Sequence, residues 1–478
     1  STRKHQNYYA GGNREIQFSQ YEKVNLTANL ALKLSKREVL RIHYLYDKAM
    51  DVGYPSLPMD VGLVEAHVLG VHYKSFIDGN AIKAWETQLY YNSIYHEMDD
   101  TKRPNVPMHM DMPGWSKTLG AWVKLHGVET LDQNWNLMME YYSNSRRAEM
   151  TMYPEDEIPM FMLTWPDILR HTFGLGFQQN WQLKPKWNLA YSLRADLNLS
   201  SVTTDLGQRH LEIFKYDVSS VFHTPVFSAK LNSSHTISSQ WQFFAKLAFA
   251  ERAPDLSEQF GFFLYNANDG YDYVGYPDIK KESAIQFEPG IKYAKNDLII
   301  EGSAYFHHVK NYILGVTDST LDAMTIGANG VRIYQNIPFA NIAGFEIRAS
   351  KKITKTVSLN ANAQYSYAVM NSNESLPLIP PLQGMVEINW RKKGWFASVK
   401  GDWANRQDRV NENFGDQPTP GYVLLGAKVG KTWTINKTSI TTEINGSNLL
   451  DNYYRNHLSW GQIPDMGRNI VLSALVNF

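Results

Sequence analysis

Apolar and polar residues alternate one by one along most of this chain. Between positions 24 and 32 the even positions are Val, Leu or Ala, and Asn and Thr occupy most of the odd ones. The same period of two recurs at 40–46 and 357–367. This period predicts β-strands with one apolar face, because successive side chains of a strand point to opposite sides. The other face is uncharged or of mixed charge, which suits contact with water better than a dry core.

The last segment shows the pattern most clearly. Its apolar residues lie at alternate positions and share one face, and the chain stops on an aromatic residue. They are Ile470, Leu472, Ala474, Val476 and Phe478. This face must be buried either in a soluble core or in lipid. In an outer-membrane barrel, a terminal aromatic residue would lie in the aromatic girdle at the membrane interface.

The whole chain contains nineteen segments of this kind, which we predict to be antiparallel strands. The predicted ranges are 22–33, 37–48, 63–76, 81–96, 115–127, 132–146, 168–182, 186–199, 222–235, 239–251, 281–294, 297–309, 339–351, 354–369, 380–391, 394–405, 420–432, 436–448 and 466–478.

Short and long connections alternate between these segments. Short turns such as 78–80 and 436–437 are separated by long connections such as 97–114 and 252–280. Because consecutive antiparallel strands reverse direction, all short turns then lie at one end and all long connections at the other. This asymmetry is typical of outer-membrane barrels, which have short periplasmic turns and long extracellular loops. The alternative, a soluble propeller, requires a repeat of about 40–50 residues, and the sequence shows none.

The strand count predicts that the barrel is incomplete in this sequence. Single-chain bacterial barrels have an even number of strands because both termini lie in the periplasm, and nineteen is odd. Residues 1–21 read as a polar loop leading into a strand. We therefore expect residues 1–478 to form about 19 strands of a 22-stranded transmembrane barrel that lacks its first three strands. The last strand should then have an unpaired edge.

Composition agrees with a barrel and excludes several other classes. The 478 residues are 43% hydrophobic and 13% aromatic, and no apolar run approaches the length of about 20 residues that a membrane helix needs. The formal net charge is zero, so no basic field indicates a nucleic-acid partner. Cysteine is absent, which excludes disulfides and thiol catalysis. No catalytic motif stands out, and we predict no enzymatic activity. The pair Arg146-Arg147 reads as a solvated strand end.

Two stretches resemble TonB-dependent outer-membrane receptors. The tail 448–455 reads NLLDNYYR and is followed by Ile463-Pro464, Gly467-Arg468-Asn469 and the final Phe478. In the middle, Arg252-Ala253-Pro254 precedes 276–282, which reads YPDIKKE, and 287–293, which reads FEPGIKY. The resemblance implies a plugged 22-stranded barrel in the outer membrane that imports a scarce nutrient. It also implies contact with lipid and with the TonB complex, through a plug that this sequence lacks before Val24.

The cargo hypothesis rests on methionine. Ten of the sixteen methionines lie between 98 and 162, in or beside long connections with acidic residues nearby. Thioethers and imidazoles are ligands that suit copper, although methionine also serves as an adaptable filler in packed regions. The candidate ligands are His96, Met98, Met108, His109, Met110 and Met112.

A further likeness favours copper. The segments HEMDD at 96–100, RPNVPMHM at 103–110 and YPSLPMD at 54–60 resemble the copper-receptor branch of the same family. The resemblance implies copper as transported ligand, no resident cofactor, and a metal site that residues of the plug complete. The alternatives are a siderophore, haem, or a peptide or glycan delivered with a surface lipoprotein. A barrel that acts as a scaffold without transport is a further alternative.

Overall fold

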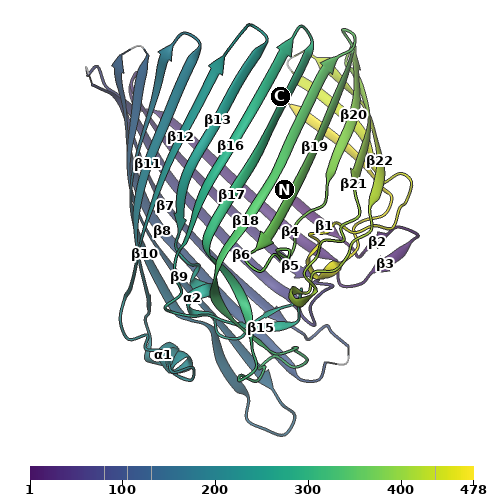
Figure 1. The fold of residues 1–478 in the computed structure, drawn as a ribbon. Coiled ribbons are helices and arrows are strands. Elements are labelled where there is room, and N and C mark those ends of the chain that lie inside the picture. Colours follow the sequence, from purple (N-terminus) through teal and green to yellow (C-terminus); the bar gives the residue numbers. More distant parts are fainter. Residues whose placement is uncertain (80, 105, 131, 437, 478) are drawn as a thin grey trace.

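The computed structural model describes residues 1–478 except 80, 105, 131, 437 and 478. Its strands lie side by side and tilted around a barrel (Figure 1). Short turns lie at one end, and long loops with helix α1 (Asp205–Glu212) lie at the other; we name these the short-turn end and the long-loop end. The main sheet contains 22 strands, so the all-β prediction is confirmed.

Nineteen of these strands are long and form the wall, ten from β4 to β13 and nine from β16 to β24. Their bounds are β4 Tyr21–Lys33, β5 Glu38–Val52, β6 Asp60–Phe76, β7 Ile82–Asp99, β8 His109–Thr130, β9 Gln133–Tyr153, β10 Met160–Lys184, β11 Trp187–Val202, β12 Phe222–Thr236, β13 Trp241–Arg252, β16 Glu282–Lys295, β17 Leu298–Asp318, β18 Val331–Lys352, β19 Val357–Met370, β20 Gln383–Lys392, β21 Trp395–Ala404, β22 Tyr422–Ile435, β23 Thr438–Ser447 and β24 Asn469–Asn477.

The remaining elements are short. They are β1 Thr2–His5, β2 Tyr8–Ala10, β3 Arg14–Ile16, β14 Leu264–Asn266, β15 Tyr271–Val274, α2 Leu256–Phe260 and the 3-10 turns Glu412–Phe414 and Trp460–Gln462. No helix among the described residues has the length and apolar character needed to cross a membrane.

Every predicted segment corresponds to one long strand, and the main differences lie at the long-loop end. There β8 begins at His109 instead of 115, β10 at Met160 instead of 168, and β18 at Val331 instead of 339. The prediction that 97–114 is entirely a loop was wrong, since β7 reaches Asp99. These extensions pair as hairpins and pack partly against the loops. Their sequences hold only short runs with a period of two, such as Met110 and Met112, and these runs were assigned to loops.

The strand registers form one antiparallel series that begins at β1. It runs through β4 to β13 and continues from β16 to β24, because β14 and β15 lie in the intervening long loop. The strand β1 pairs with Tyr21–Val24 at the start of β4. At the other end of the series, β24 pairs with β23 from Asn469 to Asn477. In this series β24 has one partner strand, and Met466, just before β24, forms an isolated antiparallel bridge with Ala10. That the last strand has an unpaired edge stays a prediction, and Phe478 lies outside the described residues.

The 22 strands of the sheet are the nineteen wall strands and the three short strands β1, β14 and β15. The described chain therefore supplies nineteen strands of wall, as predicted. Of the short turns named above, the tips at 80 and 437 also lie outside the described residues.

The wall carries an apolar band and an aromatic girdle. Leu26, Leu89 and Leu175 are more than half exposed although they lie in mid-strand. Such exposure suits a surface that faces lipid. Tryptophans gather near the short turns, where their rings mark a membrane–water interface. These are Trp85, Trp135, Trp181, Trp187, Trp241, Trp390, Trp395 and Trp433.

Buried side chains gather at the long-loop end. Met150, Leu211, Phe260 and Phe262 belong to one cluster that joins the ends of β9 and β10 to α2 and to the loop that carries α1. A smaller cluster lies at the ends of β18 and β19. The loops are therefore packed on one another and on the strand ends, which gives the methionine-rich region a defined structure.

Candidate functional site

Methionines face one another across four adjacent strands at the long-loop end. Residues that are directly opposite in an antiparallel pair lie on the same face of the sheet, with Cβ atoms about 4.5–5.5 Å apart. In four of these pairs both residues are methionine. The pairs are Met98 with Met112, Met110 with Met152, Met152 with Met160, and Met150 with Met162.

His96 lies on the same face as these methionines. It precedes Met98 by two residues on β7, and side chains two apart share a face. Its partner on β8 is Gly114, which carries no side chain. Met112 is diagonal to His96 and directly opposite Met98. One imidazole and the thioethers of Met98 and Met112 therefore lie within reach of one another.

His109 lies on the other face of β8. The alternation that places Met110 and Met112 on one side places His109 on the opposite one. Its Nδ1 lies 3.0 Å from Oδ1 of Asp100, and its side chain is 64% exposed. The backbone N–H of Met110 donates to Oδ2 of the same Asp100 (3.0 Å). Asp100 thus fixes the start of β8 and directs His109 away from the methionines.

The structure therefore does not place all six predicted ligands on one face of the sheet. His96, Met98, Met110 and Met112 share one face, His109 does not, and Met108 packs with Met110 and Met112 against the buried cluster. The structure adds further thioethers that were not among the predicted ligands. These are Met150, Met152, Met160 and Met162. These methionines belong to the methionine-rich region of the sequence, but only the strand register shows that they lie opposite the predicted ligands.

Several of these sulfur atoms lie in apolar surroundings. Met150, Met152 and Met162 are at most 2% exposed and belong to the same cluster as Leu211 and Phe260. Methionine fills such irregular spaces well, so these three side chains contribute to packing whatever else they bind. Met160, at the rim of the group, is 42% exposed. The row consequently runs from solvent into a buried region.

No group of three or more His, Asp or Glu side chains in the described part of the chain is placed to hold a metal ion. What the methionine-bearing face offers is neutral sulfur and a single imidazole, the donor set that suits a soft cation.

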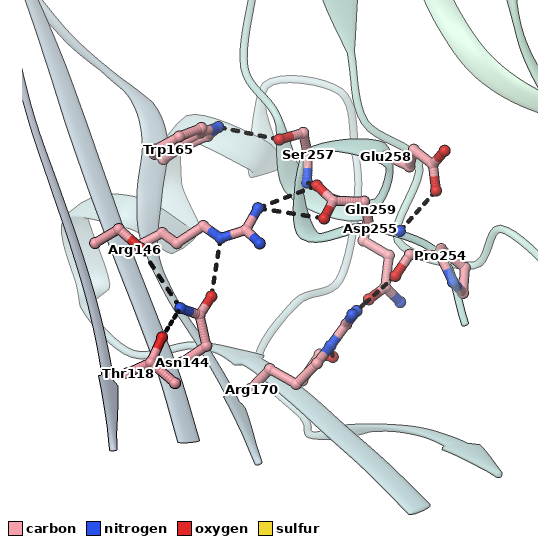
Figure 2. Close-up of polar contacts among 12 residues, drawn as sticks. Thr118, Asn144, Arg146, Trp165, Arg170, Pro254, Asp255, Ser257, Glu258 and Gln259 are labelled. Carbon is pink, nitrogen blue, oxygen red and sulfur yellow. Dashed lines mark hydrogen bonds and ion pairs between the residues drawn. The ribbon is translucent and has the colours of Figure 1, made fainter. Parts of the chain in front are cut away.

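A second arrangement of polar side chains fixes helix α2 to the wall beside this group (Figure 2). The guanidinium Nη1 of Arg146 on β9 donates to both carboxylate oxygens of Asp255 (3.1 and 3.3 Å). Nη2 of Arg170 on β10 donates to the carbonyl of Pro254 and to Oε1 of Gln259 (2.8 Å each). The two strands that carry the buried methionines thereby also hold α2.

Asp255 begins α2 and bears its negative charge there. Its side chain accepts from the backbone N–H of Ser257, and Glu258 accepts from the backbone N–H of Asp255, so the two form a capping box. Burial alone would raise the pKa of Asp255. The hydrogen bonds from Ser257 and the charge of Arg146 outweigh burial and lower the pKa below its ordinary value. Asp255 is therefore ionised at neutral pH.

The prediction for Arg146 was wrong, because the residue is a partner of α2 and not a solvated strand end. Its partner Asp255 lies 109 positions further along the chain, so no local pattern could reveal the contact. Arg147 faces the other way and pairs with Glu149 and Asp167. Arg252, in the middle stretch that carries the family resemblance, pairs with Glu258 of α2 and with Glu282.

Comparison with solved structures shows that other proteins share this fold. The chain is similar to the copper transporter OprC, with 19% identity, a TM-score of 0.84, and coverage of 99% of this chain and 76% of that one. It is also similar to the FrpB iron transporter from Neisseria meningitidis, with 12% identity, a TM-score of 0.71, and coverage of 99% and 75%.

The siderophore receptor PirA from Pseudomonas aeruginosa gives 14% identity, a TM-score of 0.62, and coverage of 96% of this chain and 70% of that one. At these identities the likeness shows the fold. No curated protein matches the chain. The family model described as "TonB dependent receptor-like, beta-barrel" matches residues 7–449, nearly the whole chain. This chain belongs to the TonB-dependent receptors, a family of outer-membrane transporters and receptors.

Proposed function

We propose that this barrel belongs to a TonB-dependent importer whose cargo is copper, bound in its Cu(I) state. The observation that carries the proposal is the row of methionine pairs with His96 on the same face of β7–β10. Thioether sulfur is a soft, neutral donor that binds Cu(I) well and binds hard cations poorly. A sulfur-rich row without carboxylates favours Cu(I) over ferric iron.

Capture would begin at the exposed end of the row. Met160 is accessible, and Glu155, Asp156 and Glu157 precede it in the hairpin tip between β9 and β10. These carboxylates raise the local concentration of cations. A Cu(I) ion could then exchange from one thioether to the next toward Met98 and His96. Because thioethers carry no proton, this exchange needs no deprotonation.

The remaining ligands of the site would come from the plug. His96, Met98 and Met112 provide at most one side of a coordination sphere, as the resemblance to copper receptors implies. We place the long-loop end outside the cell and the short-turn end, with the last strand, in the periplasm. TonB would act on the plug from the periplasm to release the ion. The similarity to OprC, a copper transporter, supports this choice of cargo.

A siderophore or an iron complex is the principal alternative cargo, since the chain has the same fold as iron and siderophore receptors. Growth of a strain that lacks the intact receptor separates the two. Under copper limitation we expect the strain to grow more slowly than its parent, and under iron limitation we expect equal growth. A defect confined to iron limitation would overturn the proposal. Re-expression of the receptor is the control.

A further inference from the structure

A hollow opens on one face of the wall, where β10, β11 and β12 run next to one another. Its volume is about 680 Å³, and its lining is mostly apolar. Most of the lining side chains belong to the exposed apolar band. They are Met139, Phe173, Leu175, Ala195, Leu197, Pro225 and Phe227.

Strand alternation places the hollow on the lipid-facing side. Arg194 precedes Ala195 on β11, and its Nη2 lies 2.8 Å from Oε2 of Glu140 and 2.7 Å from Oδ1 of Asp196. These three charged side chains lie on the face opposite to the apolar band, because neighbouring residues of a strand point to opposite sides. A charged face suits the wet interior of a barrel, so the apolar face and its hollow meet lipid.

A small side chain forms the floor of the hollow. Ala195 lies directly opposite Leu175 on β10 and Phe227 on β12. Its methyl group is much shorter than these two side chains, which therefore stand as walls on either side of it. A trough between two apolar walls on the lipid-facing side fits an extended acyl chain.

A charged pair lies at one end of the hollow. The Nζ of Lys281 donates to Oε2 of Glu251 (2.6 Å) and to the carbonyl of Pro225 (2.8 Å). The same Oε2 accepts from the backbone N–H of Phe227 (2.9 Å). An ammonium group has three N–H donors, and a carboxylate has two acceptor oxygens. Within the described part of the chain, one N–H of Lys281 and Oε1 of Glu251 therefore have no hydrogen-bond partner.

This pair lies at the level of lipid headgroups. Trp187 belongs to the girdle near the short turns, and Leu197, further along β11, lies opposite Pro225. The strand from 187 to 197 spans about 33 Å, which is about 25 Å along the barrel axis at a tilt of about 40°. The apolar band of such barrels is about 25 Å tall. Pro225 and the Lys281 ammonium bound to it are therefore at the edge of the band nearer to the long loops.

We propose that this hollow binds phosphatidylethanolamine in the leaflet at the long-loop end. One acyl chain lies over Ala195, between Leu175 and Phe227. The lipid phosphate accepts the remaining N–H of Lys281, and the lipid ammonium donates to Oε1 of Glu251. A cation beside an anion matches a zwitterionic headgroup, whereas Glu251 repels an anionic headgroup that has no amine. The proposal does not depend on the cargo.

The test uses the intact receptor in nanodiscs with equal amounts of phosphatidylethanolamine, phosphatidylcholine and phosphatidylglycerol, and native mass spectrometry after partial delipidation. We expect phosphatidylethanolamine to be retained preferentially. Choline has no N–H to donate to Glu251, and the glycerol headgroup has no cation. K281Q should lower the preference about tenfold, because it removes a charged donor. E251Q should abolish the discrimination against phosphatidylglycerol.

A second pair of variants tests the trough itself. A195F fills the floor and should lower the retention of phosphatidylethanolamine as much as K281Q does. The matched control is A304F, because Ala304 lies on the same side of the wall, opposite Phe345 on β18, and away from the hollow. We expect A304F to leave retention unchanged. Recovery of folded barrel is measured for each variant by β-sheet circular dichroism.

Three results would overturn the proposal. The first is equal retention of the three lipids by the unchanged receptor, and the second is an unchanged preference in K281Q and E251Q. These two variants preserve side-chain size, so they decide the matter if A195F does not fold. The third comes from an arm with added lipopolysaccharide, an anionic lipid of the outer leaflet. Its retention in place of phosphatidylethanolamine would show that the site selects another lipid.

Discussion

Met98 and Met112 are cross-strand partners at the long-loop ends of β7 and β8. Two residues before Met98, His96 shares their face and lies opposite Gly114. This relationship converts a methionine-rich sequence into a local donor set. It also distinguishes histidines that a reading of the sequence alone would group together.

The first prediction concerns the two histidines. H96A should weaken Cu(I) binding by the intact receptor at least about tenfold, because it removes the imidazole from the methionine face. H109A should change the affinity less than about twofold, since His109 lies on the opposite face and contacts Asp100. Competition with a Cu(I) chelator measures both affinities. A larger loss in H109A than in H96A would contradict the assignment of faces.

The second prediction concerns the attachment of α2. R146A should loosen α2 by roughly 1–3 kcal/mol, because it removes the charged partner of the partly buried Asp255. Hydrogen exchange of residues 254–260 reports this local opening. R348A, which removes an exposed ion pair far from α2, is the matched control. Equal exchange in R146A and the parent protein would show that Arg146 does not hold α2.

The third prediction concerns pH. The pKa of Asp255 is lowered in the folded protein, so its stabilising effect is fully present above the ordinary value of 3.8 and is lost as pH falls through the lower folded value. The protection factors of 254–260, which correct for the pH dependence of chemical exchange, should therefore stay constant from pH 7 to about pH 4 and fall below that. In R146A the fall should begin at a higher pH. A fall between pH 7 and 5 in the parent protein would contradict this account.

The fourth prediction concerns the two faces of the wall. L175R places a charge in the exposed apolar band and should destabilise the barrel by about 2–4 kcal/mol in lipid vesicles. Q178R, three residues further along β10 and on the other face, should have a much smaller effect. Denaturant unfolding in vesicles measures both. Equal losses would show that Leu175 does not face lipid.

The wall was predictable because one physical rule governs it. A strand between lipid and a wet interior must alternate apolar and polar residues, and this alternation located all nineteen long strands. Beyond the membrane the rule no longer applies. That is why β8 was expected to begin at 115 but begins at His109, and why β10 begins at Met160.

The change from wall to loop region also explains why the site was predicted only in part. In a flexible loop Met108, His109 and Met110 could converge on one ion, whereas a strand separates the middle residue from its neighbours. The register that brings Met152 and Met160 to Met110 depends on pairing between distant segments. The contact of Arg146 with Asp255 is equally remote in sequence. A period of two, as at Met110 and Met112, places residues on one face of a strand but does not tell which residues of another strand lie opposite.

The most direct test of the central claim is the Cu(I) affinity of the intact receptor carrying M98L, M110L and M112L together. Leu conserves volume and removes sulfur, so the fold should tolerate the change. M139L, which alters an exposed methionine of β9 outside the row, is the matched control. We predict that the triple variant loses at least about tenfold in affinity while the control keeps it. An unchanged affinity in the triple variant would contradict the assignment of copper to this site.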